Sequence, residues 1–179
     1  YQLEQARSRG INNVVICIGN LGNEVRKNVG NGEKFNLNIK YSDEGNNLLG
    51  TGGAIRNATN LLEDYFFVLY GDSWINTIYQ ELYNHIKLSG FRAIITVFKN
   101  NNKWDNSNIS INENIVLSYQ KSKNKNSNYI DYGLSLLPKK IFMKYKEKDA
   151  FDLGTVYKRL VKQKQLEAFE VYDRFYEIG

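Results

Sequence analysis

Short apolar runs alternate with helix-like segments through the first hundred residues, and this alternation constrains the fold more than any other feature. Four segments are apolar or alternating and rich in Val, Ile, Leu, Phe or Tyr, as strands are: Asn13–Ile18, Leu37–Tyr41, Tyr65–Tyr70 and Phe91–Phe98. Because a helix between successive strands favours parallel pairing, the pattern predicts an α/β protein. We expect a three-layer α/β/α sandwich with a mixed, mainly parallel sheet, in which Val14–Ile18 and Phe66–Leu69 are internal strands.

The second part of the chain continues without a repeat or a linker rich in Pro, Gly or Ser. Segments with helical patterns or helix-ending residues are Tyr1–Arg9, Glu24–Val29, Thr51–Leu62, Ile75–Leu88, Lys139–Tyr145 and Asp152–Lys162. Further strands are predicted at Asn108–Ser118, Tyr129–Leu137, Leu166–Tyr172 and Arg174–Ile178. We therefore expect a single domain over residues 1–179.

Composition excludes several classes of function. The net charge is +5, which suits phosphate ligands, but the 24 basic residues are spread out and form no dense block, so nucleic acid is not an expected partner. No apolar stretch reaches the roughly 20 residues of a membrane span. A single cysteine can form neither an internal disulfide nor a zinc cluster. These features favour a protein of the cytoplasm that has no membrane segment.

The strongest local signal is Gly71-Asp72 at the end of the apolar run Phe66–Tyr70. Ligand sites of open α/β sheets lie at the carboxyl ends of strands, and a glycine there lets a ligand approach the backbone. A carboxylate at this place suits Mg²⁺, which takes oxygen ligands and needs only one or two carboxylates beside phosphates. The alternative is an aspartate that caps a helix or a turn.

A second signal is the stretch Gly50-Thr51-Gly52-Gly53, which opens a predicted helix. The free N–H groups of a helix start suit a polar or anionic ligand, and glycines permit close approach. A plain tight turn is an equally good interpretation. The stretch is neither a P-loop nor the dinucleotide-binding glycine pattern, because the residues that define those motifs are missing.

A third signal is an acid placed just before a glycine, at Asp131-Tyr132-Gly133 and at Glu177-Ile178-Gly179. Either acid alone could be an exposed residue on a strand. Taken together and in this order, the four segments resemble the sugar-phosphate nucleotidyltransferase family, most closely the bacterial branch that makes activated mannose, heptose or related sugars for polysaccharide synthesis.

The resemblance implies a Rossmann-like nucleotidyltransferase fold and a role for each segment. Gly50, Thr51, Gly52 and Gly53 are similar to the stretch that contacts the base, and Glu44 is a further base contact. Gly71 and Asp72 resemble the family's Gly-Asp, whose acid holds Mg²⁺, and Glu177 resembles its second metal ligand. Asp131, Tyr132 and Gly133 resemble its sugar-binding segment.

The implied reaction joins a nucleoside triphosphate to a sugar 1-phosphate, giving a nucleotide sugar and pyrophosphate. GTP is the preferred nucleotide, by resemblance to the guanylyltransferase branch alone, and a homo-oligomer is one assembly that we expect. Two departures from the family pattern stand out. Tyr119-Gln120-Lys121 replaces the usual Glu-Lys-Pro, which leaves Lys121 as the best contact to the sugar phosphate. The N-terminal glycine-rich signature is also absent, so we expect a chain truncated there and at its C-terminus, without turnover on its own.

Two other functions remain open on the sequence. A metal-dependent glycosyltransferase of similar fold would also use an acid at a strand end, but typically as Asp-x-Asp, which Asp72-Ser73-Trp74 lacks. A non-catalytic nucleotide-sugar-binding domain would tolerate the missing signature.

Overall fold

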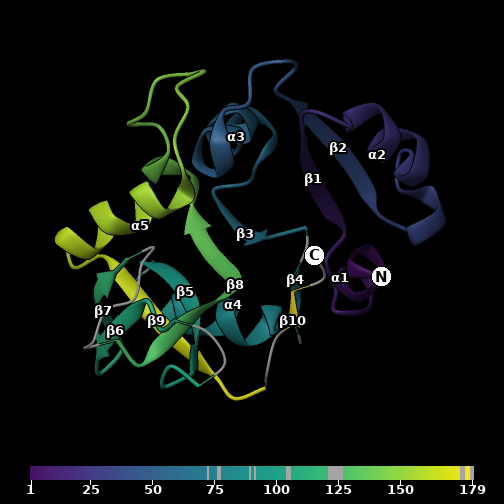
Figure 1. Cartoon of the computed structure of the whole chain (residues 1–179). Helices are drawn as coiled ribbons and strands as arrows, with labels where there is room; N and C mark the ends of the chain where they lie inside the picture. Colours follow the sequence, from purple (N-terminus) through teal and green to yellow (C-terminus); the bar gives the residue numbers. More distant parts are fainter. Residues whose placement is uncertain are drawn as a thin grey trace. The chain divides into compact units, whose positions relative to one another are not determined.

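A computed structural model of the chain describes residues 1–71, 73–75, 78–88, 90, 92–103, 106–120, 127–173 and 176–177, with backbone alone at positions 74, 176 and 177. The chain divides into two compact units (Figure 1). Unit 1 comprises Tyr1–Asp64 and Lys139–Leu153, and unit 2 comprises Tyr65–Pro138 and Gly154–Gly179. Within the described residues, no helix is long and apolar enough to cross a membrane. The single domain over residues 1–179 stays a prediction.

Unit 1 is built on two parallel strands that pair from Asn13 with Asn38 to Ile18 with Asp43. The helix between them in the chain allows this parallel pairing, because parallel neighbours need a crossover connection. The elements of unit 1 are α1 (Gln2–Ser8), β1 (Asn13–Ile18), α2 (Gly22–Val29), η1 (Glu33–Phe35), β2 (Asn38–Asp43), α3 (Gly50–Ala58), η2 (Thr59–Leu61) and η3 (Lys139–Ile141).

Helix α3 holds unit 1 together. It packs on β1 and β2 through small and branched side chains, and Ala54, Ile55 and Ala58 are buried. The buried Arg56 joins α3 to the segment Lys139–Leu153, since its Nε donates to the Tyr145 carbonyl at 2.8 Å and its guanidinium lies 3.5 Å from Glu147. A buried charge needs such partners. The segment is thereby held against the helix start that carries the glycines.

Unit 2 is built on a six-stranded sheet of order β3-β8-β5-β9-β7-β6 and a separate two-stranded ribbon of β4 and β10. The long strand β8 lies between β3 and β5 and is antiparallel to both (Figure 1). The elements are β3 (Tyr65–Leu69), β4 (Ser73–Trp74), α4 (Tyr79–Leu88), β5 (Ala93–Lys99), β6 (Ile109–Asn112), β7 (Ile115–Tyr119), β8 (Tyr129–Pro138), α5 (Leu153–Lys162), β9 (Leu166–Val171) and β10 (Tyr176–Glu177).

Helices α4 and α5 cover opposite faces of the six-stranded sheet. The hydroxyl of Tyr157 in α5 lies 2.5 Å from the Ser135 hydroxyl in β8. Ser135 is in register with Ala168 across β5. Glu167, which directly precedes Ala168 on β9, therefore faces the opposite side of the sheet. There His85 of α4 lies 3.2 Å from its carboxylate. The core of unit 2 fills both interfaces, with Leu82, Ile86, Ile94, Ile95, Leu134, Leu136, Leu137, Val156, Tyr157 and Leu160 at most 1% exposed.

The sheet is mixed, as predicted, but the prediction of mainly parallel pairing is wrong for the described residues. Only β1–β2 and β5–β9 are parallel there. The reason is β8, which comes late in the chain and inserts between β3 and β5. The two apolar strands predicted to be internal also lack a second neighbour, because β3 ends its sheet and β1 pairs with β2 alone among the described residues. An apolar run indicates that both faces of a strand are buried. It does not indicate how many strands pair with that strand. The three-layer sandwich of the whole chain stays a prediction.

Three predicted elements have different bounds in the structure. The strand predicted over Asn108–Ser118 is a hairpin of β6 and β7, which turns at Glu113 with a φ of 52°. The helix predicted over Lys139–Tyr145 is reduced to the short 3₁₀ turn η3. The helix predicted from Ile75 begins at Tyr79, because Ser73 and Trp74 form a short strand first. In each case a local pairing or turn overrides the helical or strand pattern.

Candidate active site

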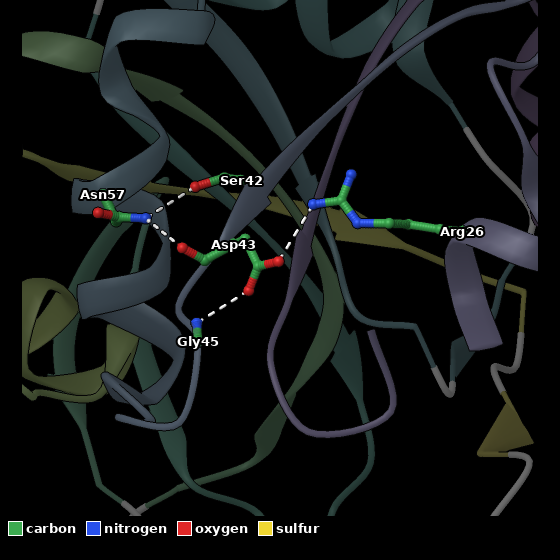
Figure 2. A network of polar contacts seen from close by, with 5 residues as sticks. All are labelled: Arg26, Ser42, Asp43, Gly45 and Asn57. Atoms are coloured by element: carbon green, nitrogen blue, oxygen red, sulfur yellow. Dashed lines mark hydrogen bonds and ion pairs between the residues drawn. The ribbon is translucent and has the colours of Figure 1, made fainter. Parts of the chain in front are cut away.

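The carboxyl end of β2 is fixed by a polar network around Asp43 (Figure 2). Its Oδ1 accepts the Gly45 N–H at 2.8 Å and its Oδ2 accepts a hydrogen bond from Arg26 at 3.1 Å. These two donors lower the pKa of Asp43, with the Gly45 N–H as the larger cause. Asn57 of α3 donates to the Ser42 hydroxyl at 3.0 Å and to the Asp43 carbonyl. The network fixes the turn that comes directly before Glu44.

Glu44, the predicted base contact, closes its own loop. Its N–H donates to the Ile18 carbonyl at 2.9 Å, which ties the residue to the end of β1. Its Oε2 accepts the Leu49 N–H at 2.5 Å, so residues 44–49 form a closed turn in front of α3. One carboxylate oxygen is thus held by the backbone. A carboxylate has about four acceptor positions, and the rest of them can receive donors of a ligand.

The glycines that open α3 serve packing inside unit 1. The N–H groups of Gly52 and Gly53 both donate to the Phe151 carbonyl, at 2.9 and 3.0 Å. A Cβ at Gly52 would lie 2.5 Å from the Phe151 ring, and a Cβ at Gly53 would lie 2.5 Å from the Asp149 carbonyl oxygen. The expectation that these two N–H groups are free for a ligand is therefore wrong, because a loop 100 residues later in the chain satisfies them.

Gly50 and Thr51 complete this arrangement. Gly50 has a φ of 69°, a conformation that favours glycine. The Thr51 hydroxyl oxygen accepts the N–H of Leu153 at 2.8 Å, at the start of α5. Phe151 also donates its N–H to the Leu49 carbonyl at 2.9 Å. The start of α3 and the residues from Phe151 to Leu153, all in unit 1, thus satisfy each other's exposed polar groups. Sequence analysis missed this exchange, since nothing in the sequence marks Phe151 as a partner.

In unit 2, strand β4, which follows Gly71 and Asp72 in the sequence, pairs with β10. Residue Glu177 of β10 lies opposite Ser73 of β4, and Tyr176 lies opposite Trp74. Asp72, the residue before Ser73, lies outside the described residues, as does Lys121. The side chain of Glu177 is likewise not described. Gly71 has open space at its Cβ position within the described part of the chain. The backbone therefore places Glu177 opposite Ser73, the residue that follows Asp72 in the sequence.

Asp131 lies beside an irregularity in β8. Ser135 pairs with Ile95 and Asp131 pairs with Val97, so β8 advances four residues (135 − 131) while β5 advances two (97 − 95). The extra residues form a bulge at Gly133, whose φ is 92°. Bulges are common next to active sites, where they redirect a side chain. Tyr132, also predicted as a sugar contact, is 1% exposed and belongs to the core.

The Asp131 carboxylate is held by two donors. Its Oδ1 accepts the Gly133 N–H at 2.9 Å, and its Oδ2 accepts the Tyr119 hydroxyl at 3.1 Å. Burial is the largest effect and raises the pKa of Asp131 to about 6, although both hydrogen bonds act to lower it. The ring of Tyr119 packs edge-on against Tyr157, with centroids 5.1 Å apart. Burial, and next the Asp131 charge, raise the pKa of Tyr157. Sequence analysis names Tyr119 only within the stretch that replaces Glu-Lys-Pro and misses its bond to Asp131, and it misses Tyr157 altogether.

The described side chains form no cluster of three or more His, Cys, Asp or Glu that could hold a metal ion. A magnesium site built from two carboxylates and phosphate oxygens needs no such cluster. Taken separately, unit 1 offers the closed acidic turn of Glu44, and unit 2 offers the Asp131 carboxylate beside Gly133.

Comparison with known proteins decides the family. The sequence profile described as nucleotidyl transferase matches residues 1–174. The chain belongs to the nucleotidyl transferase family. It is 28% identical over 177 residues to the D-glycero-alpha-D-manno-heptose 1-phosphate guanylyltransferase of Campylobacter jejuni, covering 98% of this chain and 77% of that protein. It is also 38% identical over 76 residues to a glucose-1-phosphate thymidylyltransferase of Streptomyces antibioticus, covering 42% of this chain and 21% of that protein.

Solved structures agree on the fold. HddC from Yersinia pseudotuberculosis, in a complex with GMP-PN, matches with a TM-score of 0.80 and 23% identity over 100% of this chain and 79% of its own. The UTP-bound UGPase of Acinetobacter baumannii matches with a TM-score of 0.72 and 15% identity over 99% of this chain and 77% of its own. At these identities the likeness concerns the fold alone. Family membership confirms the resemblance drawn from the four sequence segments.

Proposed function

We propose that this nucleotidyl transferase moves a nucleotidyl group from a nucleoside triphosphate to a sugar 1-phosphate, releasing pyrophosphate and a nucleotide sugar. The observation that supports it best is the match of the family profile to residues 1–174, in a chain whose β4–β10 ribbon pairs Glu177 with the residue after Asp72. Relatives named as guanylyl- and thymidylyltransferases point to the same reaction class.

The proposed reaction requires little proton transfer by side chains of the protein. An oxygen of the sugar phosphate attacks the α-phosphorus in line, and pyrophosphate leaves from the opposite side. This nucleophile is already ionised near pH 7. Catalysis therefore rests on holding the two substrates in line and on stabilising charge at the α-phosphate. In this proposal Asp131 and Lys121 contact the acceptor, while Glu44 and the Gly50–Gly53 stretch contact the base through groups other than the Gly52 and Gly53 N–H.

Mg²⁺ is the metal that the proposed site suits. Asp72 and Glu177 supply carboxylate oxygens, which are the ligands that Mg²⁺ prefers, and the substrate phosphates would supply the others. The pairing of Glu177 with Ser73, the residue after Asp72 in the sequence, supports a shared ion. When bound, the ion would neutralise charge on the α-phosphate.

Guanine is the base that we propose. The Glu44 carboxylate is held at Oε2 by the Leu49 N–H, and a carboxylate only accepts hydrogen bonds. Guanine presents adjacent N1–H and N2–H donors that such a group can receive. A site built to bond a substrate N–H rejects an analogue that lacks it. Inosine triphosphate, which lacks the N2 amino group, is therefore the informative competitor.

A substrate panel tests the proposal. The full-length protein is incubated with GTP, inosine triphosphate, UTP, dTTP, CTP or ATP, each with mannose, glucose or D-glycero-α-D-manno-heptose 1-phosphate and Mg²⁺. Pyrophosphate release and the mass of the nucleotide sugar are measured. We expect turnover with GTP, and roughly tenfold or greater loss of kcat/KM with inosine triphosphate.

The outcomes separate the candidates. Nucleotide binding without pyrophosphate release under any condition would favour a non-catalytic binding domain and overturn the proposal. Efficient turnover with dTTP or UTP in place of GTP would overturn the base assignment alone. A location in the cytoplasm and a homo-oligomer stay predictions.

A further inference from the structure

The Tyr119 hydroxyl lies at a place where it controls the Asp131 carboxylate. Among the described residues, each oxygen of this carboxylate has one donor, the Gly133 N–H at 2.9 Å and the Tyr119 OH at 3.1 Å. The backbone is fixed as well, because the Asp131 N–H donates to the Asn108 side chain at 3.3 Å. A carboxylate has about four acceptor positions, and the donors among the described residues occupy two of them.

The origin of the two donors differs. Gly133 belongs to the same strand as Asp131, and its N–H is set by the bulge in β8. Tyr119 comes from β7, which is not an adjacent strand in the sheet. Its ring is supported by the edge-on contact with Tyr157 at 5.1 Å between centroids. A hydroxyl held from a distant strand by a packed ring fixes the direction in which the carboxylate's remaining acceptor positions point.

We propose that Tyr119 is a positioning residue for the acceptor sugar: with the Gly133 N–H, it holds the Asp131 carboxylate ionised and aimed so that it accepts hydrogen bonds from sugar hydroxyl groups. This inference rests on the proposed function. It assigns Asp131 to the hydroxyl side of the acceptor and away from its phosphate, because two negative groups in contact would repel each other.

The charge state of Asp131 supports this role. Burial raises the pKa of Asp131 to about 6, against the lowering effect of its two donors. Among the described residues, the groups that face it or lie near it are tyrosines: Tyr119 from β7, Tyr157 from α5, and Tyr70 after β3. With no cation among these described neighbours, the hydroxyl of Tyr119 is one of two donors that favour the ionised form.

The variant Tyr119→Phe in the full-length protein is the direct test. The phenyl ring keeps the contact with Tyr157 and removes only the hydroxyl. We expect the KM for the sugar 1-phosphate to rise about tenfold at pH 7, with kcat and the KM for the nucleotide nearly unchanged. We also expect the acid limb of kcat/KM for the acceptor to move to higher pH, because the lost donor favoured the carboxylate.

Tyr129→Phe is the matched control. Tyr129 lies two residues before Asp131 on β8, and its hydroxyl donates to a different carboxylate, that of Glu170, at 3.4 Å. This variant removes a tyrosine–carboxylate hydrogen bond from the same sheet. The acceptor KM and the acid limb should stay where they are in the unmodified protein. An equal change in both variants would assign the effect to general loosening of the sheet and would overturn the proposal.

A second measurement does not depend on turnover. The ¹³C carboxyl resonance of Asp131, identified by its loss in Asp131→Asn, is titrated by NMR. Its midpoint should rise in Tyr119→Phe and stay constant in Tyr129→Phe. A constant midpoint in Tyr119→Phe would overturn the role of its hydroxyl.

Asp131→Asn separates this inference from the proposed function. A raised acceptor KM in Asp131→Asn with an unchanged KM in Tyr119→Phe overturns the role of Tyr119 and leaves the proposed function standing. An unchanged acceptor KM in Asp131→Asn overturns the acceptor site and, with it, this inference.

Discussion

Two glycine-containing segments stand out in this sequence, and the structure uses them differently. In unit 1, Gly52 and Gly53 leave no room for a Cβ, and their N–H groups donate to the Phe151 carbonyl. In unit 2, the Gly133 N–H donates to a carboxylate whose pKa is raised to about 6. In the first segment, the backbone N–H groups form hydrogen bonds within the protein. In the second segment, the Gly133 N–H holds the Asp131 carboxylate in place. The comparison teaches that a glycine at a helix start or in a strand bulge marks close approach, and only the partner tells whether the approach serves packing or ligand binding.

Asp72→Ala should give the largest effect and places the chemistry in unit 2. We expect kcat/KM of the full-length protein to fall by roughly 10²–10³ or more, about 3–4 kcal/mol, as for the loss of other charge-stabilising groups. The unfolding midpoint should hardly change, since the residue follows the end of a strand. Asp64→Ala is the control, because that carboxylate is 91% exposed and is paired only with Lys139 among the described residues. Near-normal Mg²⁺-dependent activity in Asp72→Ala would contradict the metal assignment.

Gly53→Ala should act on stability and assigns the α3 glycines to packing. The new methyl group would lie 2.5 Å from the Asp149 carbonyl oxygen and 2.8 Å from the Leu49 Cβ, so backbone must move. Alanine favours a helix over glycine by about 1 kcal/mol, which is less than the cost of the clash. We expect a net loss of roughly 3 kcal/mol in the free energy of unfolding. Urea denaturation followed by circular dichroism measures it. An unchanged urea midpoint would show that the segment Lys139–Leu153 moves to accommodate the methyl group at little cost, and it would contradict this prediction.

The sequence predicts the elements of this fold well where a pattern is local. Apolar runs predict the strands at Asn13–Ile18 and Tyr65–Leu69, and helical spacing predicts α5. The hairpin at Glu113 was missed, because a single left-handed residue interrupts an otherwise strand-like run. The antiparallel insertion of β8 was also missed, since strand order depends on partners that lie far apart in the chain.

The candidate site shows the same limit. Asp131 and its glycine are visible in the sequence as an acid two residues before a glycine. Tyr119 is not, because its hydroxyl reaches Asp131 from a strand that is not an adjacent neighbour in the sheet. The use of the Phe151 carbonyl by Gly52 and Gly53 is equally hidden. Long-range hydrogen bonds are set by packing, and no local spacing encodes them.

Asp131→Asn tests whether the Asp131 carboxyl has a raised pKa, through the pH dependence of the free energy of unfolding. Because burial raises the pKa of Asp131 from 3.8 to about 6, the folded state keeps a proton in this range that the unfolded state has lost. Stability contributed by the protonated acid is therefore lost as pH rises through this window. The amide carries no such proton. We expect the stability of the variant relative to the unmodified protein to increase by about 2 kcal/mol between pH 4 and pH 7.

Urea unfolding of both proteins at several pH values gives this difference, and the other acids cancel because both proteins contain them. A difference that is constant with pH would contradict the raised pKa. The unit 2 segment would then resemble the unit 1 glycines, with its polar groups used for structure alone.

Gly71→Ala should have the smallest effect on the fold and is the sharpest test of the comparison. Nothing in the described part of the chain lies within 4 Å of a Cβ at this position, and the residue is not in the left-handed region. We therefore expect the free energy of unfolding to change by less than about 0.5 kcal/mol. If the glycine serves a ligand, the same methyl group should raise the KM for the nucleoside triphosphate by about tenfold. The two substitutions then have different effects. Gly53→Ala lowers the free energy of unfolding, and Gly71→Ala weakens binding of the nucleoside triphosphate. Loss of stability in Gly71→Ala equal to that in Gly53→Ala would make both glycines packing residues, and an unchanged KM would remove the case for ligand approach at Gly71.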